Sequence, residues 1–331
     1  MDYIKLGSTD LEVSRICFGT LWIGGVEENN AIASINRAID LGVNFIDTAE
    51  GYGEGRAEKT VARAIAGKRD KCVIATKCGL YWGQFAGKVP QPTENHINMM
   101  GQRSEDRFRN SHPAYIELAI EGSLQRLGTD YIDLYQIHYP DSSVPWEDTI
   151  GALQKAQTAG KIRYFGVSNF TQQQTQAWLR KGPMHSLQPL YNMFEREIEQ
   201  DLLPFCREHN IAVLPYSSLA HGLLTGKFHE DWHFGEGDFR GQTRVFKGDN
   251  FKRNLAVVEK LKEMAAAKGV TMAQLALAWV ITQPGVASAL AAAKSPAQVE
   301  DNVRAIECDL DHADMARVEQ ILAGGPPAAP T

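Results

Sequence analysis

Short apolar runs alternate with amphipathic stretches along almost the whole chain. A short continuous apolar run is typical of a parallel strand, because such a strand is buried on both faces and has no polar side. We therefore predict eight strands, at residues 16–19, 44–46, 72–76, 131–137, 162–167, 187–189, 212–215 and 287–291.

The stretches between these runs have the periodicity of helices that bury one face. Between residues 113 and 127, for example, Ile116, Ile120 and Leu124 recur on one helical face, and Gly128 suits a C-terminal stop. Strand–helix alternation builds either a closed barrel or an open doubly wound sheet, and eight units favour a (β/α)8 TIM barrel. The helices are predicted at residues 31–41, 113–127, 145–159, 172–179, 198–209, 254–268, 272–282 and 296–305.

The two ends of the chain differ from this repeat. Residues 2–14 have the pattern of a β-hairpin, and the Pro- and Ala-rich residues 324–331 that of a loose tail. Extra helices are expected near the C-terminus, and residues 1–331 are interpreted as a single domain. The long connections 78–112 and 216–251 each follow a strand, so both should lie on the C-terminal face, where barrel enzymes place their sites.

Composition narrows the functional classes. A net charge of −6 without a basic block gives no indication of a nucleic-acid partner. No run of 18 apolar residues and no signal-peptide core is present, so we expect a cytoplasmic protein with no membrane partner. The five cysteines show no close metal-ligand spacing, and no metal is expected.

Polar side chains stand where three neighbouring strands are predicted to end. Asp47 ends the second strand, Lys77 ends the third, His138 ends the fourth, and Tyr52 follows Asp47 closely. Buried charges must pair, so Asp47 and Lys77 should meet. An ammonium near a phenol favours the phenolate, so we expect Lys77 to lower the pKa of Tyr52 and His138 to orient a substrate oxygen.

These residues lie in segments that resemble the aldo-keto reductase family along nearly the whole chain. The segments GTLWIGG, DTAEGYGEGRAE, ATKCG, LGTDYIDLYQIHYPD, AGKIRYFGVSNF, LQPLYN, PYSSLAHGLLTGKF and AAAKSPAQVEDN occur in the family's order. The resemblance implies Asp47, Tyr52, Lys77 and His138 as the catalytic tetrad, with Tyr52 as proton donor. It is strongest to a subgroup with a long seventh loop, which includes bacterial inositol-utilisation-associated and general-stress reductases and the potassium-channel beta subunits.

The same resemblance implies NADP(H) as cofactor, bound without a Gly-rich Rossmann loop. It carries over the nicotinamide contacts to Ser168, Asn169, Gln188 and Tyr216. A Lys before a helix suits a 2′-phosphate, which favours NADP(H) over NAD(H). The remaining implied cofactor contacts are Thr20, Leu21, Ser217, Leu219, Gly222, Lys227, Arg240, Lys294, Gln298, Asp301 and Asn302.

The expected reaction is reversible reduction of an aldehyde, ketone or sugar-like carbonyl to the alcohol. Trp22, Tyr81 and Trp82 lie in loops predicted to face the substrate, whereas Glu50 and Asp141 are predicted to be surface residues. The expected partner is therefore a small molecule, and the chain could be a monomer or a homo-oligomer.

Two other functions remain open. A cofactor-sensing regulatory subunit with weak or no turnover is the first, but the potassium-channel beta subunits replace the residue that is His138 here. A metal-dependent barrel hydrolase is the second, but it needs His and carboxylate ligands at several strand ends. Only Asp47 and His138 qualify, and Lys77 would repel a cation.

Overall fold

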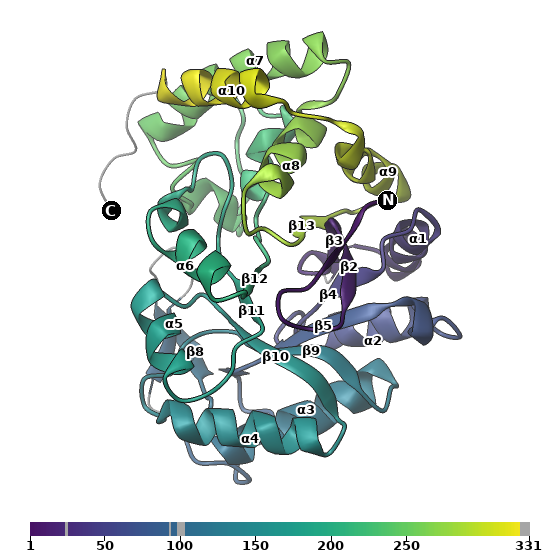
Figure 1. Cartoon of the computed structure of the whole chain (residues 1–331), viewed down its shortest axis with the longest axis vertical. Helices are drawn as coiled ribbons and strands as arrows, with labels where there is room; N and C mark the ends of the chain where they lie inside the picture. Colours follow the sequence, from purple (N-terminus) through teal and green to yellow (C-terminus); the bar gives the residue numbers. More distant parts are fainter. Residues whose placement is uncertain (24–25, 93, 98–102, 325–331) are drawn as a thin grey trace.

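The computed structural model describes residues 1–23, 26–92, 94–97 and 103–324, and it confirms the predicted (β/α)8 barrel (Figure 1). All neighbouring strands of the eight-stranded sheet are parallel, in the order β12-β11-β10-β9-β5-β4-β3-β13. The strands are β3 (Ile16–Gly19), β4 (Phe45–Asp47), β5 (Val73–Cys78), β9 (Ile132–Ile137), β10 (Ile162–Ser168), β11 (Ser186–Gln188), β12 (Ala212–Val213) and β13 (Ala289–Ala292).

The barrel closes between β12 and the chain that leads into β13. Val213 forms an isolated parallel bridge with Val286, and the Ala287 amide donates to the Val213 carbonyl at 2.9 Å. Further along the same two segments, the Leu290 amide donates to the Pro215 carbonyl at 2.9 Å. These bonds join the first and last strands of the sheet, which decides for the barrel over the open sheet.

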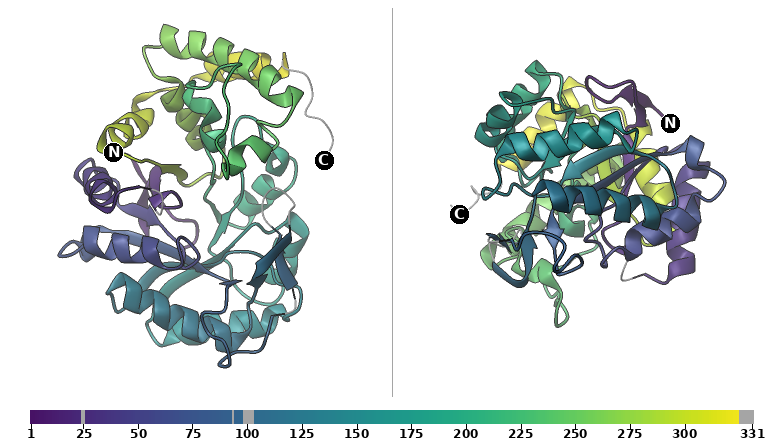
Figure 2. Two further views of the ribbon diagram at one scale, coloured as in Figure 1. Left: turned by 180° about the vertical axis from the view of Figure 1, so that it is seen from behind. Right: turned by 90° about the horizontal axis from the view of Figure 1, so that it is seen from below.

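Helices surround the barrel in all three views (Figures 1 and 2). They are α1 (Glu28–Asp40), α2 (Arg56–Ala64), α3 (Pro113–Leu127), α4 (Trp146–Thr158), α5 (Gln172–Leu179), α6 (Leu202–Glu208), α7 (Asp249–Ala267), α8 (Met272–Thr282), α9 (Pro296–Val303) and α10 (His312–Ala323). Short 3-10 helices are η2 (Arg69–Lys71), η3 (Glu197–Glu199), η4 (Ala220–Thr225), η5 (Phe239–Gln242) and η6 (Arg304–Glu307).

The predicted N-terminal hairpin is formed by β1 (Tyr3–Lys5) and β2 (Glu12–Ser14), which pair antiparallel. Leu6, Leu11 and Val13 are buried in a cluster with Phe45, the first residue of β4. Because the first residue of a parallel strand lies at the N-terminal end, the hairpin covers the end of the barrel opposite the predicted site.

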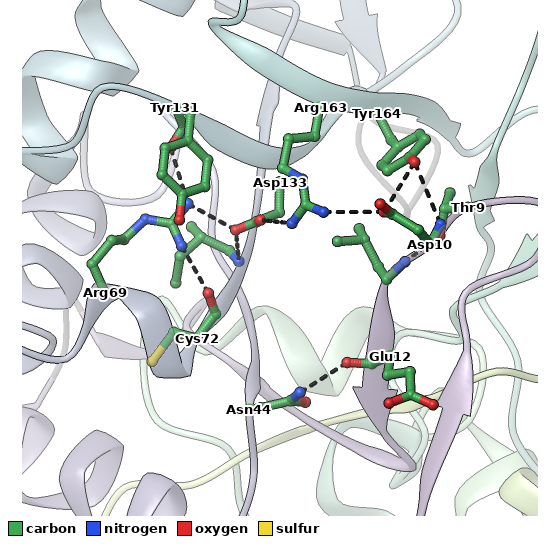
Figure 3. A network of polar contacts seen from close by, with 12 residues as sticks. Thr9, Asp10, Glu12, Asn44, Arg69, Cys72, Tyr131, Asp133, Arg163 and Tyr164 are labelled. Atoms are coloured by element: carbon green, nitrogen blue, oxygen red, sulfur yellow. Dashed lines mark hydrogen bonds and ion pairs between the residues drawn. The ribbon is translucent and has the colours of Figure 1, made fainter.

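A polar network fastens this hairpin to the barrel (Figure 3). The Asp133 carboxylate, 2% exposed, accepts hydrogen bonds from Arg69 at 2.7 Å and from Arg163 at 2.9 Å. Arg163 also donates to Asp10 in the hairpin turn at 3.0 Å, and the Tyr164 hydroxyl donates to the same Asp10 oxygen at 3.0 Å. Two arginines thus compensate one buried carboxylate.

The connection after β5 carries an antiparallel sheet of its own, which the apolar pattern did not predict. Its strands are β6 (Leu80–Tyr81), β7 (Glu94–Ile97) and β8 (Arg103–Arg109), in the order β6-β8-β7. The connection after β12 contains η4 and η5, and α7 begins earlier than predicted. The predicted tail lies outside the described residues apart from Gly324.

No single helix in the described part of the chain is long and apolar enough to cross a membrane. Helices α7 and α8 together pass a test of length and composition, but they meet at an angle of 91°.

Candidate active site

The four residues of the predicted tetrad come together at the C-terminal face of the barrel. Asp47 is the last residue of β4, Lys77 lies near the end of β5, and His138 directly follows β9. Since β4, β5 and β9 are consecutive neighbours in a parallel sheet, their ends point the same way. Tyr52 reaches the same place from the connection between β4 and α2.

Lys77 is the centre of this group. Its Nζ donates to Asp47 Oδ1 at 2.6 Å and to the Thr48 carbonyl at 3.0 Å, and it lies 3.3 Å from Tyr52 Oη. Lys77 is 0% exposed and Asp47 is 2% exposed. Neither charge is solvated by water, so each depends on the other, as the sequence predicted.

The predicted direction of the Tyr52 pKa is wrong. Burial raises the pKa of Tyr52 well above its usual value, and the Asp47 carboxylate raises it further. Burial disfavours the charged phenolate, and here it outweighs the ammonium of Lys77 at 3.3 Å. Tyr52 is therefore a neutral phenol at neutral pH and carries a proton that it can donate.

The His138 ring lies against the Tyr52 ring. The two ring centroids are 5.7 Å apart at an angle of 76°. The His138 ring also stacks on Tyr139, with centroids 5.0 Å apart and planes at 18°. Burial, and next the neighbouring Tyr52, raise the pKa of Tyr139 to about 12. Sequence reasoning missed Tyr139, although its place directly after a strand-end histidine was a signal.

A second set of polar side chains continues from the ion pair across the barrel. Gln188 Nε2 donates to the other Asp47 oxygen at 2.9 Å, and the Ser168 hydroxyl donates to the Gln188 carbonyl at 2.7 Å. Asn169 Nδ2 donates to the His138 carbonyl at 2.9 Å, and Asn169 Oδ1 accepts from the Tyr216 hydroxyl at 2.8 Å. The residues predicted to contact the nicotinamide are thus joined to the predicted tetrad.

Backbone strain marks the same face. Asn169, Ser217, Ala220 and His221 have φ values of 62°, 55°, 46° and 54°, in the left-handed region that side chains rarely adopt. Such residues persist only where their surroundings hold them, and they concentrate at functional sites. Gly222, with a φ of 96°, completes this turn in η4.

Three cations gather beyond this turn. Lys227 is exposed; partial desolvation is the largest cause that lowers its pKa, followed by the positive charges of Arg240 and Lys294. The Lys294 ammonium lies 5.4 Å from the centre of the Trp22 ring. Trp22 in turn stacks on Phe239 with centroids 5.3 Å apart, so the predicted substrate residue Trp22 belongs to this group.

Arg240 is engaged within its own turn. Its guanidinium forms a bidentate pair with Asp238, from Nε at 2.9 Å and from Nη2 at 2.5 Å. The hydrogen bonds from Arg240 lower the pKa of Asp238. Burial acts in the opposite direction but is the smaller effect, so the net shift is a lowering. To bind a cofactor phosphate, the Arg240 guanidinium must therefore leave the Asp238 carboxylate or bind both groups at once.

The other predicted cofactor residues are spread around this face. Thr20 is fully buried, and its hydroxyl has no hydrogen-bond partner among the described residues, whereas Leu21 is 44% exposed. Gln298 accepts from the Lys294 amide at 2.7 Å at the start of α9. Leu219 is partly buried at the start of η4.

Two predicted residues on α9 have other partners. Asp301 accepts from Gln274 at 2.7 Å and from Thr271 at 3.1 Å, both at the start of α8. Asn302 is 6% exposed and donates to the Ala292 carbonyl at 3.4 Å. The structure therefore joins Asp301 to α8 rather than to Lys294.

Two residues predicted to lie on the surface are buried. Glu50 is 1% exposed, and its carboxyl accepts from the Tyr115 hydroxyl at 2.5 Å. Asp141 is also 1% exposed and accepts from the Ser111 amide at 2.8 Å and from the Ser143 hydroxyl at 2.6 Å. Their sequence neighbours are polar, so the pattern alone placed both in solvent.

The predicted substrate residues Tyr81 and Trp82 lie in and directly after β6. Tyr81 is 4% exposed and packs edge-on against Tyr115 at 6.0 Å. Trp82 is partly exposed, and the Arg107 guanidinium lies 5.6 Å from its ring centre. In the described ranges, no three His, Cys, Asp or Glu side chains are grouped as metal ligands.

Comparison with known proteins identifies the family. The model of the Aldo/keto reductase family matches residues 15–323. The chain belongs to this family. Its members reduce carbonyl groups with NADH or NADPH, and the chain is accordingly an oxidoreductase.

Several aldo/keto reductases match over nearly full length. The chain is 38% identical to aldo-keto reductase YhdN of Bacillus subtilis (strain 168), covering 97% of this chain and 94% of the relative. It is 33% identical to an NADH-specific methylglyoxal reductase of Escherichia coli (strain K12), covering 97% and 98%.

Solved structures show the same fold. The glycerol dehydrogenase AKR11B4 from Gluconobacter oxydans superposes with a TM-score of 0.87 at 37% identity, covering 100% of this chain and 98% of that one. An aldo/keto reductase from Klebsiella pneumoniae in complex with NADP and acetate has a TM-score of 0.73 at 31% identity, covering 99% and 97%.

Proposed function

We propose that this chain reduces an aldehyde, ketone or sugar-like carbonyl to the alcohol with NADPH, reversibly, and that Tyr52 is the general acid. The observation that carries the proposal is the contact of Lys77 Nζ with Tyr52 Oη at 3.3 Å. Burial raises the pKa of this phenol. A neutral phenol has a proton to give, and a fixed ammonium stabilises the phenolate that forms when it gives it.

The bound nicotinamide would supply the hydride to the carbonyl carbon. The carbonyl oxygen then gains negative charge and takes the proton from Tyr52 Oη. Lys77 stabilises the resulting phenolate, and Asp47 holds Lys77 charged and in place at 2.6 Å. We propose that His138, whose ring packs against the Tyr52 ring, donates to the same substrate oxygen. Run backwards, Tyr52 takes a proton from the alcohol.

The residues fit a dinucleotide at two points. The buried Thr20 hydroxyl lacks a hydrogen-bond partner in the described part of the chain, and it lies directly after β3. Lys227, Arg240 and Lys294 repel one another, and an anion placed among them would relieve that repulsion. We propose that Ser168, Asn169, Gln188 and Tyr216 hold the nicotinamide end and that these cations hold the phosphates.

The preference for NADPH rests on this cluster. The 2′-phosphate of NADPH adds negative charge that NADH lacks, and Lys294 would pair with it before the start of α9. The two relatives named by their cofactor differ, since one is NADH-specific and the other was solved with NADP. The cofactor must therefore be measured on this chain.

The test is consumption of NADPH and of NADH by the wild type and by Lys294→Ala with a panel of aldehydes, ketones and sugars. We expect turnover with NADPH, and a loss of NADPH affinity in the variant of roughly 10- to 100-fold, the value of one charge-assisted hydrogen bond. NADH affinity should change little. Tight NADPH binding without reduction of any carbonyl would contradict the proposal.

We further propose that the chain belongs to the subgroup with a long seventh loop. In its connection after β12, the segment Gly237–Arg240 forms a turn that is held by the bidentate pair of Asp238 and Arg240. A cytoplasmic location is in keeping with the five cysteines, all of which are buried and free of disulfides. The substrate is proposed to be a small molecule, turned over by a monomer or a homo-oligomer.

A further inference from the structure

Glu50 makes contacts that the proposed reaction does not use. It is 1% exposed, and its Oε1 accepts from the Tyr115 hydroxyl at 2.5 Å and from the Gly79 amide at 3.1 Å. Tyr115, fully buried on α3, also has its hydroxyl 3.3 Å from the Leu80 carbonyl. One carboxyl thus joins the loop before Tyr52 to α3 and to the start of β6.

Gln84 extends this contact to the segment that follows β5. Its Nε2 donates to the Tyr115 hydroxyl at 2.9 Å, and its Oε1 accepts from the Trp82 amide at 2.8 Å. The hydrogen-bond chain Glu50–Tyr115–Gln84 therefore ends on the backbone of Trp82. Phe85 packs edge-on against the Tyr115 ring at 5.7 Å and closes the turn.

The held segment lies beside the catalytic tyrosine. A Cβ added at Gly51, the residue before Tyr52, would lie 3.4 Å from Leu80 Cδ1, so the Leu80 side chain packs against the backbone beside Tyr52. Arg107 lies 3.3 Å from the Glu54 carboxylate and 5.6 Å from the centre of the Trp82 ring. The segment that bears Leu80 and Trp82 is thus linked to the Tyr52 loop at Gly51 and, through Arg107, at Glu54.

We propose that Glu50 is a positioning residue that sets the Tyr81–Trp82 turn against Tyr52 through Tyr115 and Gln84, and thereby sets how tightly the carbonyl substrate binds. The proposal rests on the proposed function, since it assigns Tyr81 and Trp82 to the substrate. It predicts that the hydrogen-bond acceptor at residue 50 is what matters and that its charge is not.

The chemistry of the site supports an uncharged Glu50. Burial is the main cause that raises the pKa of Glu50 to about 8, so the carboxyl is protonated at neutral pH. Glu58 opposes its ionisation, whereas Tyr115, Arg126 on α3 and the Gly79 amide favour it. Cys78 and Tyr135 also face it, and Glu50 raises the pKa of both. A glutamine side chain has the same length as a protonated glutamate and offers the same uncharged acceptor oxygen in place of Oε1.

The test compares Glu50→Gln, Glu50→Leu, Tyr115→Phe and Gln84→Leu in the full chain. Tyr164→Phe is the matched control, because its hydroxyl also donates to a carboxylate, that of Asp10 at 3.0 Å (Figure 3). This contact lies in the hairpin region, at the opposite end of the barrel. Hydrogen exchange of residues 79–86 is measured without substrate. KM, kcat and NADPH affinity are measured with a carbonyl that the wild type reduces.

We expect faster exchange of residues 79–86 in Glu50→Leu, Tyr115→Phe and Gln84→Leu, with KM raised roughly five- to tenfold, the effect of one lost hydrogen bond. Values of kcat and NADPH affinity should stay within about twofold. Glu50→Gln and Tyr164→Phe should resemble the wild type in exchange and in KM.

Unchanged exchange in both Tyr115→Phe and Gln84→Leu would overturn the proposal, as would a fall of kcat at constant KM. Failure of Glu50→Gln to rescue what Glu50→Leu loses would also overturn it. If the Tyr115 variant does not fold, the partly exposed Gln84 carries the same test. If no carbonyl is reduced, the proposed function fails. The exchange rates still decide whether the hydrogen bonds Glu50–Tyr115–Gln84 hold the Tyr81–Trp82 turn.

Discussion

At the scale of single residues, Lys77 has a proposed role in catalysis and a structural role in stability. Its ammonium has no exposed surface and pairs with Asp47 at 2.6 Å. We predict that Lys77→Met abolishes most turnover and destabilises the fold by about 3–5 kcal/mol, because Asp47 is left as an uncompensated buried charge. Denaturant unfolding measures the stability, and the double variant Asp47→Asn/Lys77→Met is the control. It should regain much of the stability and none of the activity; regained activity would contradict the assignment.

Glu50 should make the stability depend on pH in an unusual direction. Its folded-state pKa of about 8 lies above the unfolded value of ~4.3, so the folded protein holds the proton more tightly. The contribution of Glu50 to stability is therefore greatest at low pH and is lost as pH rises from ~4 to about 8. Against Glu50→Gln, the wild type should lose up to ~1.4 kcal/mol per pH unit in this window. A difference that does not vary with pH would show that folding does not raise the pKa of Glu50.

The sequence predicted the tetrad's meeting place but not the state of its members. Strand ends located Asp47, Lys77 and His138, because parallel strands present their ends at one face. The Tyr52 pKa was predicted in the wrong direction, since the depth of burial is a property of the folded chain. For the same reason Glu50 was placed on the surface.

At the scale of elements, the hairpin and the barrel are joined by charges of very different burial. The Asp133 side chain is 2% exposed between two arginines, whereas that of Asp10 is 70% exposed. We predict that Asp133→Asn costs about 3–5 kcal/mol of unfolding free energy and that Asp10→Ala costs less than about 1 kcal/mol, although both contact Arg163. Both variants should keep the KM of the wild type, because they lie at the far end of the barrel. Equal losses of stability would refute the role given to burial.

The elements were predicted as well as their apolar patterns allowed. Strand β3 and helices α3, α5 and α8 have the predicted bounds, because apolar periodicity and end signals coincide there. The nine-residue α2 was missed, since Val61 is the one apolar side chain larger than alanine in RAEKTVARA. Strands β7 and β8 were missed because ENHI and RSEDRFR are mostly polar, and β6 was missed because it is only two residues long.

At the scale of the whole molecule, the barrel brings side chains from distant parts of the chain into one site. Gln188 and Asp47 are 141 residues apart in sequence and 2.9 Å apart in space. No local pattern predicts such a contact; the eightfold alternation predicted the closed barrel that makes it possible, but not the contact itself. Which carbonyl and which cofactor the site accepts depends on loops. Their polar side chains have no periodic pattern from which a structure could be predicted.

The central claim is that Tyr52 supplies the proton from within a site formed before the carbonyl binds. The measurement that tests it is kcat/KM of Tyr52→Phe beside Tyr164→Phe, with NADPH affinity determined for both. We predict a loss of roughly 10²–10⁴ in Tyr52→Phe, with NADPH bound as tightly as by the wild type, and wild-type rates in Tyr164→Phe. A Tyr52→Phe enzyme that turns over within tenfold of the wild type would show that another group donates the proton.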